Sequence, residues 1–248
     1  MKANVSAFLF LAALLGTFTV NAQVQEGEAP DPRTERVRRT VRLGLQFAPE
    51  ISWFKAQDNS IQSTGTGIGY SFGPVVDFKF GENYALSTGI NIVNARGGVR
   101  YLQDSVFFNS YKDQRYPKLT SADYRIRFVE IPILLRLSTN EIGYMTYFAH
   151  FGFVPGFAIG TKGDIEDATP SPNFSRNNEN LGKDITPFNM SLQVGAGLSY
   201  SLTNTASVFA HLSFVNGFVD ITNNPNKENN YKSKAILNRV PLTVGVYF

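Results

Sequence analysis

Residues 188–202 read FNMSLQVGAGLSYSL, and this stretch decides the fold class. Every second residue from Phe188 onward is apolar, and the residues between them are Gly, Ser, Asn or Gln. Successive side chains of a β-strand point to opposite faces, so a strand here has one apolar face and one small, polar face. A helix would scatter both kinds of residue around its axis. The pattern therefore predicts one long strand.

Seven further stretches alternate in the same way, at residues 41–55, 66–80, 83–99, 122–138, 142–161, 205–222 and 235–248. Strands of soluble domains average about five or six residues, and these are much longer. Long strands with an apolar and a polar, Gly-rich face are typical of membrane barrels, apolar toward lipid and polar inside. We predict an all-β fold, a closed eight-stranded antiparallel up-and-down transmembrane β-barrel. A soluble barrel would show the reverse pattern, with bulky apolar residues inside.

The composition excludes several classes of protein. Only 17% of the 248 residues are charged, against roughly 25% in soluble domains, and 43% are hydrophobic, which argues against disorder. The chain has no Cys, so no disulfide and no Cys-ligated metal can form. The 23 Lys and Arg residues form no long basic run, so we expect no nucleic-acid partner.

The first 22 residues have the features of a secretory signal peptide. Lys2 precedes an apolar core, and Ala22 is a small residue at the expected cleavage point. A membrane anchor is the less favoured alternative, because the apolar core is short and contains Gly16 and Thr17. Residues 23–40 are rich in charge and Pro, so we expect a flexible charged periplasmic arm, either a spacer or a docking segment. The barrel is expected over residues 41–248.

Links between the predicted strands fall into two classes. Short turns are expected at 81–83, 138–141 and 203–204, and longer links at 56–65, 100–121, 162–184 and 223–234. Outer-membrane barrels have short periplasmic turns and longer extracellular loops. We therefore expect a location in the bacterial outer membrane, with its lipid as surroundings and with both termini periplasmic.

The inward face of the predicted barrel carries a layer of polar residues. An eight-stranded barrel is only just wide enough for its own side chains, so a pore is not expected. Counted from the strand ends, seven inward residues fall at about one height, with His211 slightly lower: Glu50, Asn91, Glu130, His150, Gln193, His211 and Arg239. We expect Glu130 to meet His150, and Glu50 to meet Arg239. A hydrogen-bonded structural plug is favoured over a proton- or ligand-responsive site.

Catalysis is not expected. Ser191, Ser213, His150 and His211 could supply a nucleophile and a base, but no local motif orders them and all point inward. The sequence shows no metal-ligand spacing and no phosphate-binding glycine pattern. We predict a non-enzymatic protein with no cofactor.

The C-terminus resembles the last-strand signature of bacterial outer-membrane proteins. The chain ends on Phe248, with Val246 and Val244 at alternate positions before it. The resemblance implies an assembly signal, and hence the barrel-assembly machinery as a partner during biogenesis.

Residues 128–136, FVEIPILLR, resemble a strand of the PorT-like outer-membrane β-barrel proteins of Bacteroidetes. The segments at 85–89 (ALSTG) and 152–156 (GFVPG) resemble neighbouring parts of that family. The resemblance extends over the predicted barrel and implies its fold and location. Because the family's namesake is required for type IX protein secretion, it also implies a structural or partner-binding role with secretion-system proteins. A surface adhesin or recognition protein acting through the links at 100–121 and 162–184, and a small-solute porin, remain as alternatives.

Overall fold

The computed structural model describes residues 40–102, 105–166, 175–223 and 233–248. The predicted signal peptide, and the predicted arm apart from Thr40, lie outside the described residues. Among the described residues, no helix is both long and apolar enough to cross a membrane. The elements found there are β1 (Val41–Ala56), β2 (Ile61–Lys79), β3 (Tyr84–Gly89), β4 (Asn91–Tyr101), β5 (Ser105–Phe108), β6 (Tyr111–Pro117), β7 (Ser121–Glu130), β8 (Ile133–Ser138), β9 (Met145–Glu166), β10 (Arg176–Asn180), the short 3-10 helix η1 (Gly182–Asp184), β11 (Phe188–Ser201), β12 (Ser207–Gly217) and β13 (Ala235–Tyr247).

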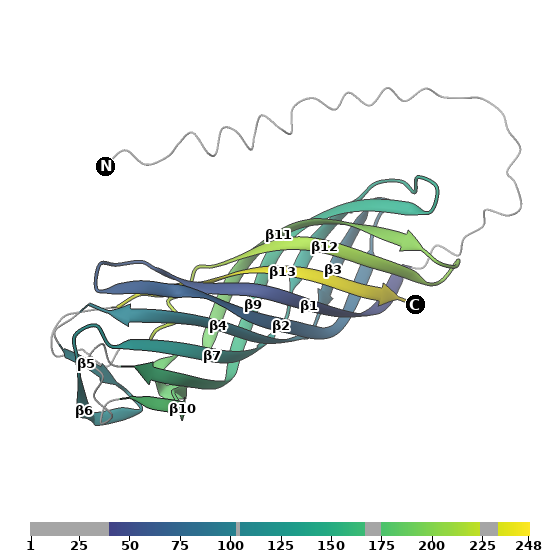
Figure 1. The fold of residues 1–248 in the computed structure, drawn as a ribbon. Helices are drawn as coiled ribbons and strands as arrows, with labels where there is room; N and C mark the ends of the chain where they lie inside the picture. Colours follow the sequence, from purple (N-terminus) through teal and green to yellow (C-terminus); the bar gives the residue numbers. More distant parts are fainter. Residues whose placement is uncertain (1–39, 103–104, 167–174, 224–232) are drawn as a thin grey trace, which may run out of the picture. The chain divides into compact units, whose positions relative to one another are not determined.

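The fold is all-β, and its strands pair antiparallel around a common interior (Figure 1). The pairing order is β1-β13-β12-β11-β9-β7-β4-β2, and β2 pairs in turn with β1, so the order returns to its first strand. The predicted strands at 83–99 and 122–138 are each divided in two. The first is interrupted at Ile90, and the second at Ile131 and Pro132. All-β antiparallel structure was thus predicted correctly from the sequence.

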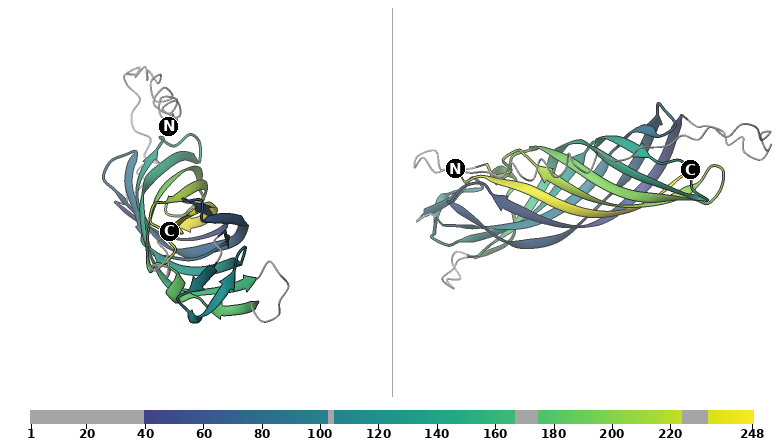
Figure 2. Two further views of the ribbon diagram at one scale, coloured as in Figure 1. Left: turned by 90° about the vertical axis from the view of Figure 1, so that its left-hand side faces the viewer. Right: turned by 90° about the horizontal axis from the view of Figure 1, so that it is seen from above.

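The two ends of the ring differ (Figures 1 and 2). We call the end that carries β5, β6 and β10 the hairpin end, and the opposite end, where Phe248 lies, the C-terminal end. From the C-terminal end to about two thirds of the way along β9, the outward side chains are large and apolar. Phe151, Phe153 and Ile159 are 47%, 56% and 58% exposed. Over this part, the predicted apolar outer face is confirmed, and we call it the apolar belt.

The pattern of inward and outward side chains reverses at the hairpin end. There, 18 buried apolar residues of the described ranges form one core, which includes Phe54, Tyr124 and Leu237. Their neighbours on the outer face are polar, such as Lys55 and Arg125. The expectation of a polar interior along the whole strand is therefore wrong here. An outer face that meets water is polar, and burial of the inner apolar face stabilises the fold.

The predicted alternation of short and long links is wrong at the first link. The link expected at 56–65 has only four residues, 57–60, because β1 and β2 continue past the apolar belt. The link expected at 100–121 contains the β5–β6 hairpin, and β9 continues to Glu166, where β10 pairs with it. The side chains of these strand extensions also alternate, but the apolar ones face inward and the polar ones outward. A sequence pattern defined by apolar residues on the outer face therefore places the strand ends too early.

The hairpin is fastened to the ring through the carboxylate of Asp184. The backbone N–H groups of Asn109 and Ser110 both donate to it, and the Ser110 hydroxyl donates over 2.6 Å. The Asn109 side chain donates to the carbonyl oxygen of Asn223 over 2.8 Å. Burial raises the pKa of Asp184, and these hydrogen bonds oppose that shift by favouring the charged form. Three distant segments therefore meet at the hairpin end.

Candidate functional site

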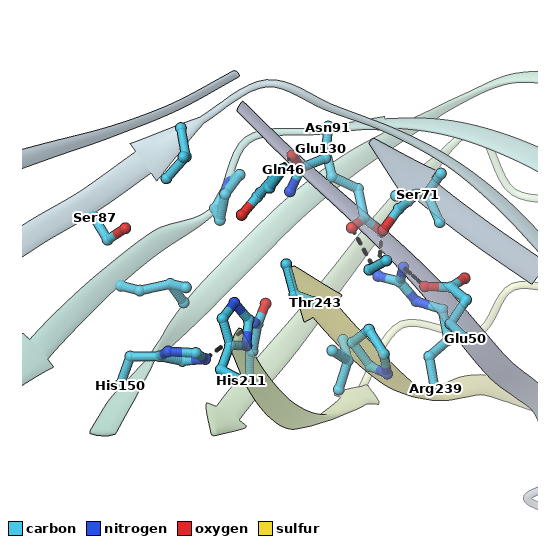
Figure 3. A pocket seen from close by; sticks show the side chains of 18 of the residues that line it. Gln46, Glu50, Ser71, Ser87, Asn91, Glu130, His150, His211, Arg239 and Thr243 are labelled. Atoms are coloured by element: carbon cyan, nitrogen blue, oxygen red, sulfur yellow. Dashed lines mark hydrogen bonds and ion pairs between the residues drawn. The ribbon is translucent and has the colours of Figure 1, made fainter. Parts of the chain in front are cut away.

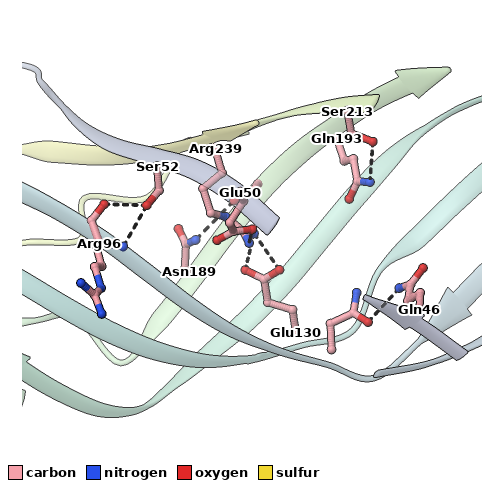
Figure 4. Close-up of polar contacts among 11 residues, drawn as sticks. Gln46, Glu50, Ser52, Arg96, Glu130, Asn189, Gln193, Ser213 and Arg239 are labelled. Carbon is pink, nitrogen blue, oxygen red and sulfur yellow. Dashed lines mark hydrogen bonds and ion pairs between the residues drawn. The ribbon is translucent and has the colours of Figure 1, made fainter. Parts of the chain in front are cut away.

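An ion-paired triad lies inside the ring. Arg239 on β13 donates from Nη1 to Glu50 Oε2 on β1 over 3.2 Å, and from Nη2 to both carboxylate oxygens of Glu130 on β7 over 2.6 and 2.7 Å (Figure 4). All three residues are buried. Charge-assisted hydrogen bonds of this kind are about twice as strong as neutral ones, and Arg239 here is shared between two carboxylates. We call Glu50, Glu130 and Arg239 the charged triad.

The strand register explains how the triad assembles. Between the adjacent strands β1 and β13, Glu50 lies opposite Pro241 and Arg239 opposite Ser52, so the two charges are diagonal neighbours. Glu130 reaches Arg239 from a strand that is not adjacent to β13, across the interior. It packs over Gly156, where any Cβ would crowd the Glu130 side chain. The Glu50–Arg239 ion pair was expected from the sequence, and the larger contribution of Glu130 was not.

A histidine cluster lies next along the interior. The hydroxyl of Ser213 lies 3.1 Å from His150 Nε2 and 3.0 Å from His211 Nδ1, and Gln193 donates to it over 3.3 Å. The two imidazole rings are 4.6 Å apart and almost perpendicular. Gly195 makes room for this contact, because a Cβ there would clash with both Ser213 and His150.

The expected contact between Glu130 and His150 is not formed. Glu130 on β7 lies opposite Gly156 on β9, whereas His150, also on β9, lies opposite Arg136 on β8. The stagger between tilted strands separates residues that a simple count along each strand places at one height. Asn91 is separate again, and accepts a hydrogen bond from Gln46 over 2.9 Å. The single predicted layer is therefore three groups.

A second charged cluster was missed in the sequence. Asp77 Oδ2 accepts from Arg42 over 2.9 Å and from Arg136 over 3.1 Å, and Arg136 also donates to the Tyr247 hydroxyl over 2.8 Å. The Arg136 guanidinium lies 3.6 Å from the centre of the Phe148 ring. The sequence did contain a signal for this cluster. The alternation of side chains along each strand is enough to place Asp77, Arg136 and Tyr247 on the inward face.

The space left inside is small. The cavity between the charged triad and the histidine cluster has a volume of about 50 Å³, enough for a few water molecules (Figure 3). Ser213 and its two imidazoles line or adjoin this enclosed space, so a substrate has no room beside them. Within the described ranges, no group of three or more His, Asp or Glu side chains is arranged to hold a metal ion.

A family model described as outer membrane protein beta-barrel domain matches residues 21–223, which is most of the chain. The chain belongs to this family. Membership in the outer membrane β-barrel family supports a location in the bacterial outer membrane. Membership also explains why the large apolar side chains of the belt are exposed, because strands of outer membrane barrels are surrounded there by hydrocarbon. No curated protein matches the sequence.

Several solved outer membrane proteins are similar to this chain at low identity. Neisserial surface protein A is 12% identical with a TM-score of 0.43, and the match covers 84% of this chain and 96% of that one. OprG of Pseudomonas aeruginosa is 13% identical with a TM-score of 0.42, covering 84% and 94%. The Escherichia coli outer membrane protease OmpT is 11% identical with a TM-score of 0.38, covering 84% and 93%.

Removal of Arg239 from the charged triad is predicted to destabilise this outer membrane β-barrel strongly. Arg239→Gln leaves two buried carboxylates facing each other, which costs roughly 3–5 kcal/mol. Because Glu130 holds Arg239 by two hydrogen bonds, adding Glu130→Gln should recover more of the loss than adding Glu50→Gln. The measurement is the urea midpoint of the protein refolded in lipid vesicles.

A matched control for this prediction is Arg125→Gln. Arg125 pairs with Asp164 at 2.9 Å, but the two side chains are 37% and 29% exposed. Such a pair contributes about 1 kcal/mol or less. Strictly additive losses in the Arg239 and Glu130 double variant, or a loss for Arg239→Gln no larger than the control, would contradict the triad.

Proposed function

We propose that the chain forms a closed, eight-stranded transmembrane barrel that is non-enzymatic and does not conduct solutes, and that binds a partner through its hairpin end. The C-terminal end, with both termini, faces the periplasm in this proposal, and the hairpin end faces the cell exterior. The observation that carries the proposal is the filled interior. Apolar residues fill one end, and paired charges fill the other.

The filled interior argues against the porin alternative. A conducting eight-stranded barrel needs a continuous aqueous path, and this width leaves little space beyond the side chains. Here the cavity of about 50 Å³ is lined by the charged triad, by the two histidines and by Arg136. Function is therefore expected on the outer surfaces of the molecule.

The surface at the hairpin end is best suited to a partner. Asp184 and Asn223 hold the β5–β6 hairpin in place, and Phe108 of the hairpin packs against Tyr101 of β4 with nearly perpendicular rings 5.7 Å apart. An anchored loop loses little conformational entropy on binding, which favours recognition of a partner protein. The finer proposal is that this partner belongs to the type IX secretion system.

The secretion role rests on the resemblance at residues 128–136. The charged side chains of that motif are buried in the barrel interior. Glu130 binds Arg239 and Arg136 binds Asp77, and Pro132 lies where β7 ends and β8 begins. The motif therefore supports the fold more strongly than it supports any one role. A surface adhesin that uses the same hairpin end is the second candidate.

Epitope tags test the proposed orientation. A tag inserted after Asn59 or Lys118, at the hairpin end, should be reachable by antibody on intact cells. A tag after Asn140 or Asn204, at the C-terminal end, should be reachable only after the outer membrane is permeabilised. All four residues are exposed and lie outside the barrel strands. The opposite pattern would reverse the topology.

Two measurements test the proposed function. Purified protein in planar bilayers should show no steady conductance above the protein-free bilayer, and an ohmic conductance would restore the porin alternative. In cells, we expect replacement of residues 105–117 by a short Gly-Ser link to reduce type IX secretion while the barrel still inserts. Lengthening the turn at 203–205 is the matched control. Normal secretion after the replacement would exclude that secretion role and leave surface recognition.

A further inference from the structure

Four cations form one patch on the outer face of β4, β7 and β9. Strand pairing places Arg96 opposite Arg125, and Arg125 opposite Lys162, so three cations on adjacent strands lie in one row. Arg127 lies on the same face, two residues nearer the apolar belt, opposite Asn94 and Gly160. We call Arg96, Arg125, Arg127 and Lys162 the cationic row. Its members come from positions up to 66 residues apart.

The cationic row borders the apolar belt directly. On the belt side, the same strands present Val129 and Phe157, which lie opposite each other, and Ile159. Phe157 and Ile159 are more than half exposed. On the far side of the row come the acidic residues Asp123 and Asp164, which also face each other across β7 and β9. The cations therefore occupy the level between hydrocarbon and the more acidic outer rim.

Among the described residues, the row is only partly neutralised. Arg125 pairs with Asp164 at 2.9 Å, and Arg127 donates from Nε to Asn94 Oδ1 over 3.0 Å. Arg96 and Lys162 are exposed, and neither side chain has an ion-pair or hydrogen-bond partner in the described part of the chain. Like charges directly opposite each other on a sheet are destabilising. An external anion would relieve that repulsion.

The backbone beneath the row is held in place. The Ser52 hydroxyl inside the ring donates to the carbonyl oxygen of Arg96 over 2.6 Å and accepts from its N–H over 2.8 Å (Figure 4). Gly67 on the intervening strand β2 permits this approach, because a Cβ there would strike Arg96. The Arg96 side chain is thus directed outward from a fixed stretch of backbone.

We infer that the cationic row binds the phosphate groups of an anionic lipid in the membrane leaflet at the hairpin end. Guanidinium groups match phosphate oxygens in paired hydrogen bonds, and Lys162 adds a point charge. The belt residues beside the row, Phe157 and Ile159, would contact the acyl chains of the same lipid. A soluble anion gains nothing from that apolar contact, whereas a membrane lipid satisfies both surfaces. This inference rests on the proposed transmembrane barrel.

Native mass spectrometry of the refolded mature protein in dodecyl maltoside micelles tests the inference. Diphosphoryl lipid A is the probe, and the same glycolipid with both phosphates removed is the comparison. We expect the wild type to retain the phosphorylated lipid about tenfold more strongly. The variant with Arg96→Gln, Arg127→Gln and Lys162→Gln should lose that preference, because each exposed charge contributes a modest part. Equal retention of the two lipids by the wild type would overturn the inference without any variant.

A control variant removes the same charge elsewhere. Lys55→Gln, Lys183→Gln and Lys234→Gln replace exposed lysines outside the row and should keep the lipid preference. Loss of the preference in this control would show a general charge effect and overturn the inference. Displacement of the lipid by millimolar inorganic phosphate, or equal binding of a sulfated oligosaccharide, would do the same, because either would show a site for soluble anions.

Failure of the inference can be distinguished from failure of the proposed function. Heat-modifiable migration of the wild type on gels reports a folded, inserted barrel independently of lipid retention. A folded barrel without phosphate preference contradicts only the cationic row as a lipid site. A protein that shows no folded form in micelles or vesicles contradicts the transmembrane barrel itself.

Discussion

Alternation of side chains in the strands couples the inner face of the ring to the outer face. Where the outer face must be apolar to meet hydrocarbon, most of the large apolar residues are used outside, and the interior holds small and polar groups beside one small apolar cluster that includes Phe148 and Phe209. Those polar groups have little water around them, so they must satisfy one another. Arg239 between Glu50 and Glu130, and Asp77 between Arg42 and Arg136, meet most of this requirement. Glu50 Oε1 and Asp77 Oδ1 are still buried without a hydrogen-bond partner among the described residues. The first cluster has one excess negative charge and the second one excess positive charge.

The same coupling acts in reverse beyond the belt. Once the outer face carries Lys55, Arg125 and Lys162, the inner positions become Phe54, Tyr124 and their apolar neighbours. The hairpin end can therefore form a core like that of a soluble protein, closed by Phe108 and Tyr116. The ring thus joins a zone with exposed apolar side chains outside to an end with a packed apolar core inside, and the cationic row lies at the boundary between them.

The sequence was sufficient to predict the alternating strands, but not the register in which neighbouring strands pair. Residues 188–202 and their seven counterparts predicted the strands and the apolar outer face, because both depend on local period alone. The contact of Glu50 with Arg239 was also accessible, since those strands come first and last. Strand stagger was not accessible, so Glu130 was assigned to His150 although it binds Arg239. The cationic row could not be predicted from the sequence either. Only the pairing of β4, β7 and β9 brings Arg96, Arg125 and Lys162 together.

A cysteine scan along β9 tests the two-zone account most directly. The chain has no Cys, so single cysteines can be introduced and spin-labelled without other substitutions. In lipid vesicles, labels at Phe151, Phe153 and Ile159 should be accessible to oxygen and shielded from a water-soluble nickel chelate. Labels at Lys162 and Asp164 should show the opposite preference. Nickel accessibility at 151 and 153, or unchanged oxygen accessibility through 164, would contradict a membrane boundary at the cationic row.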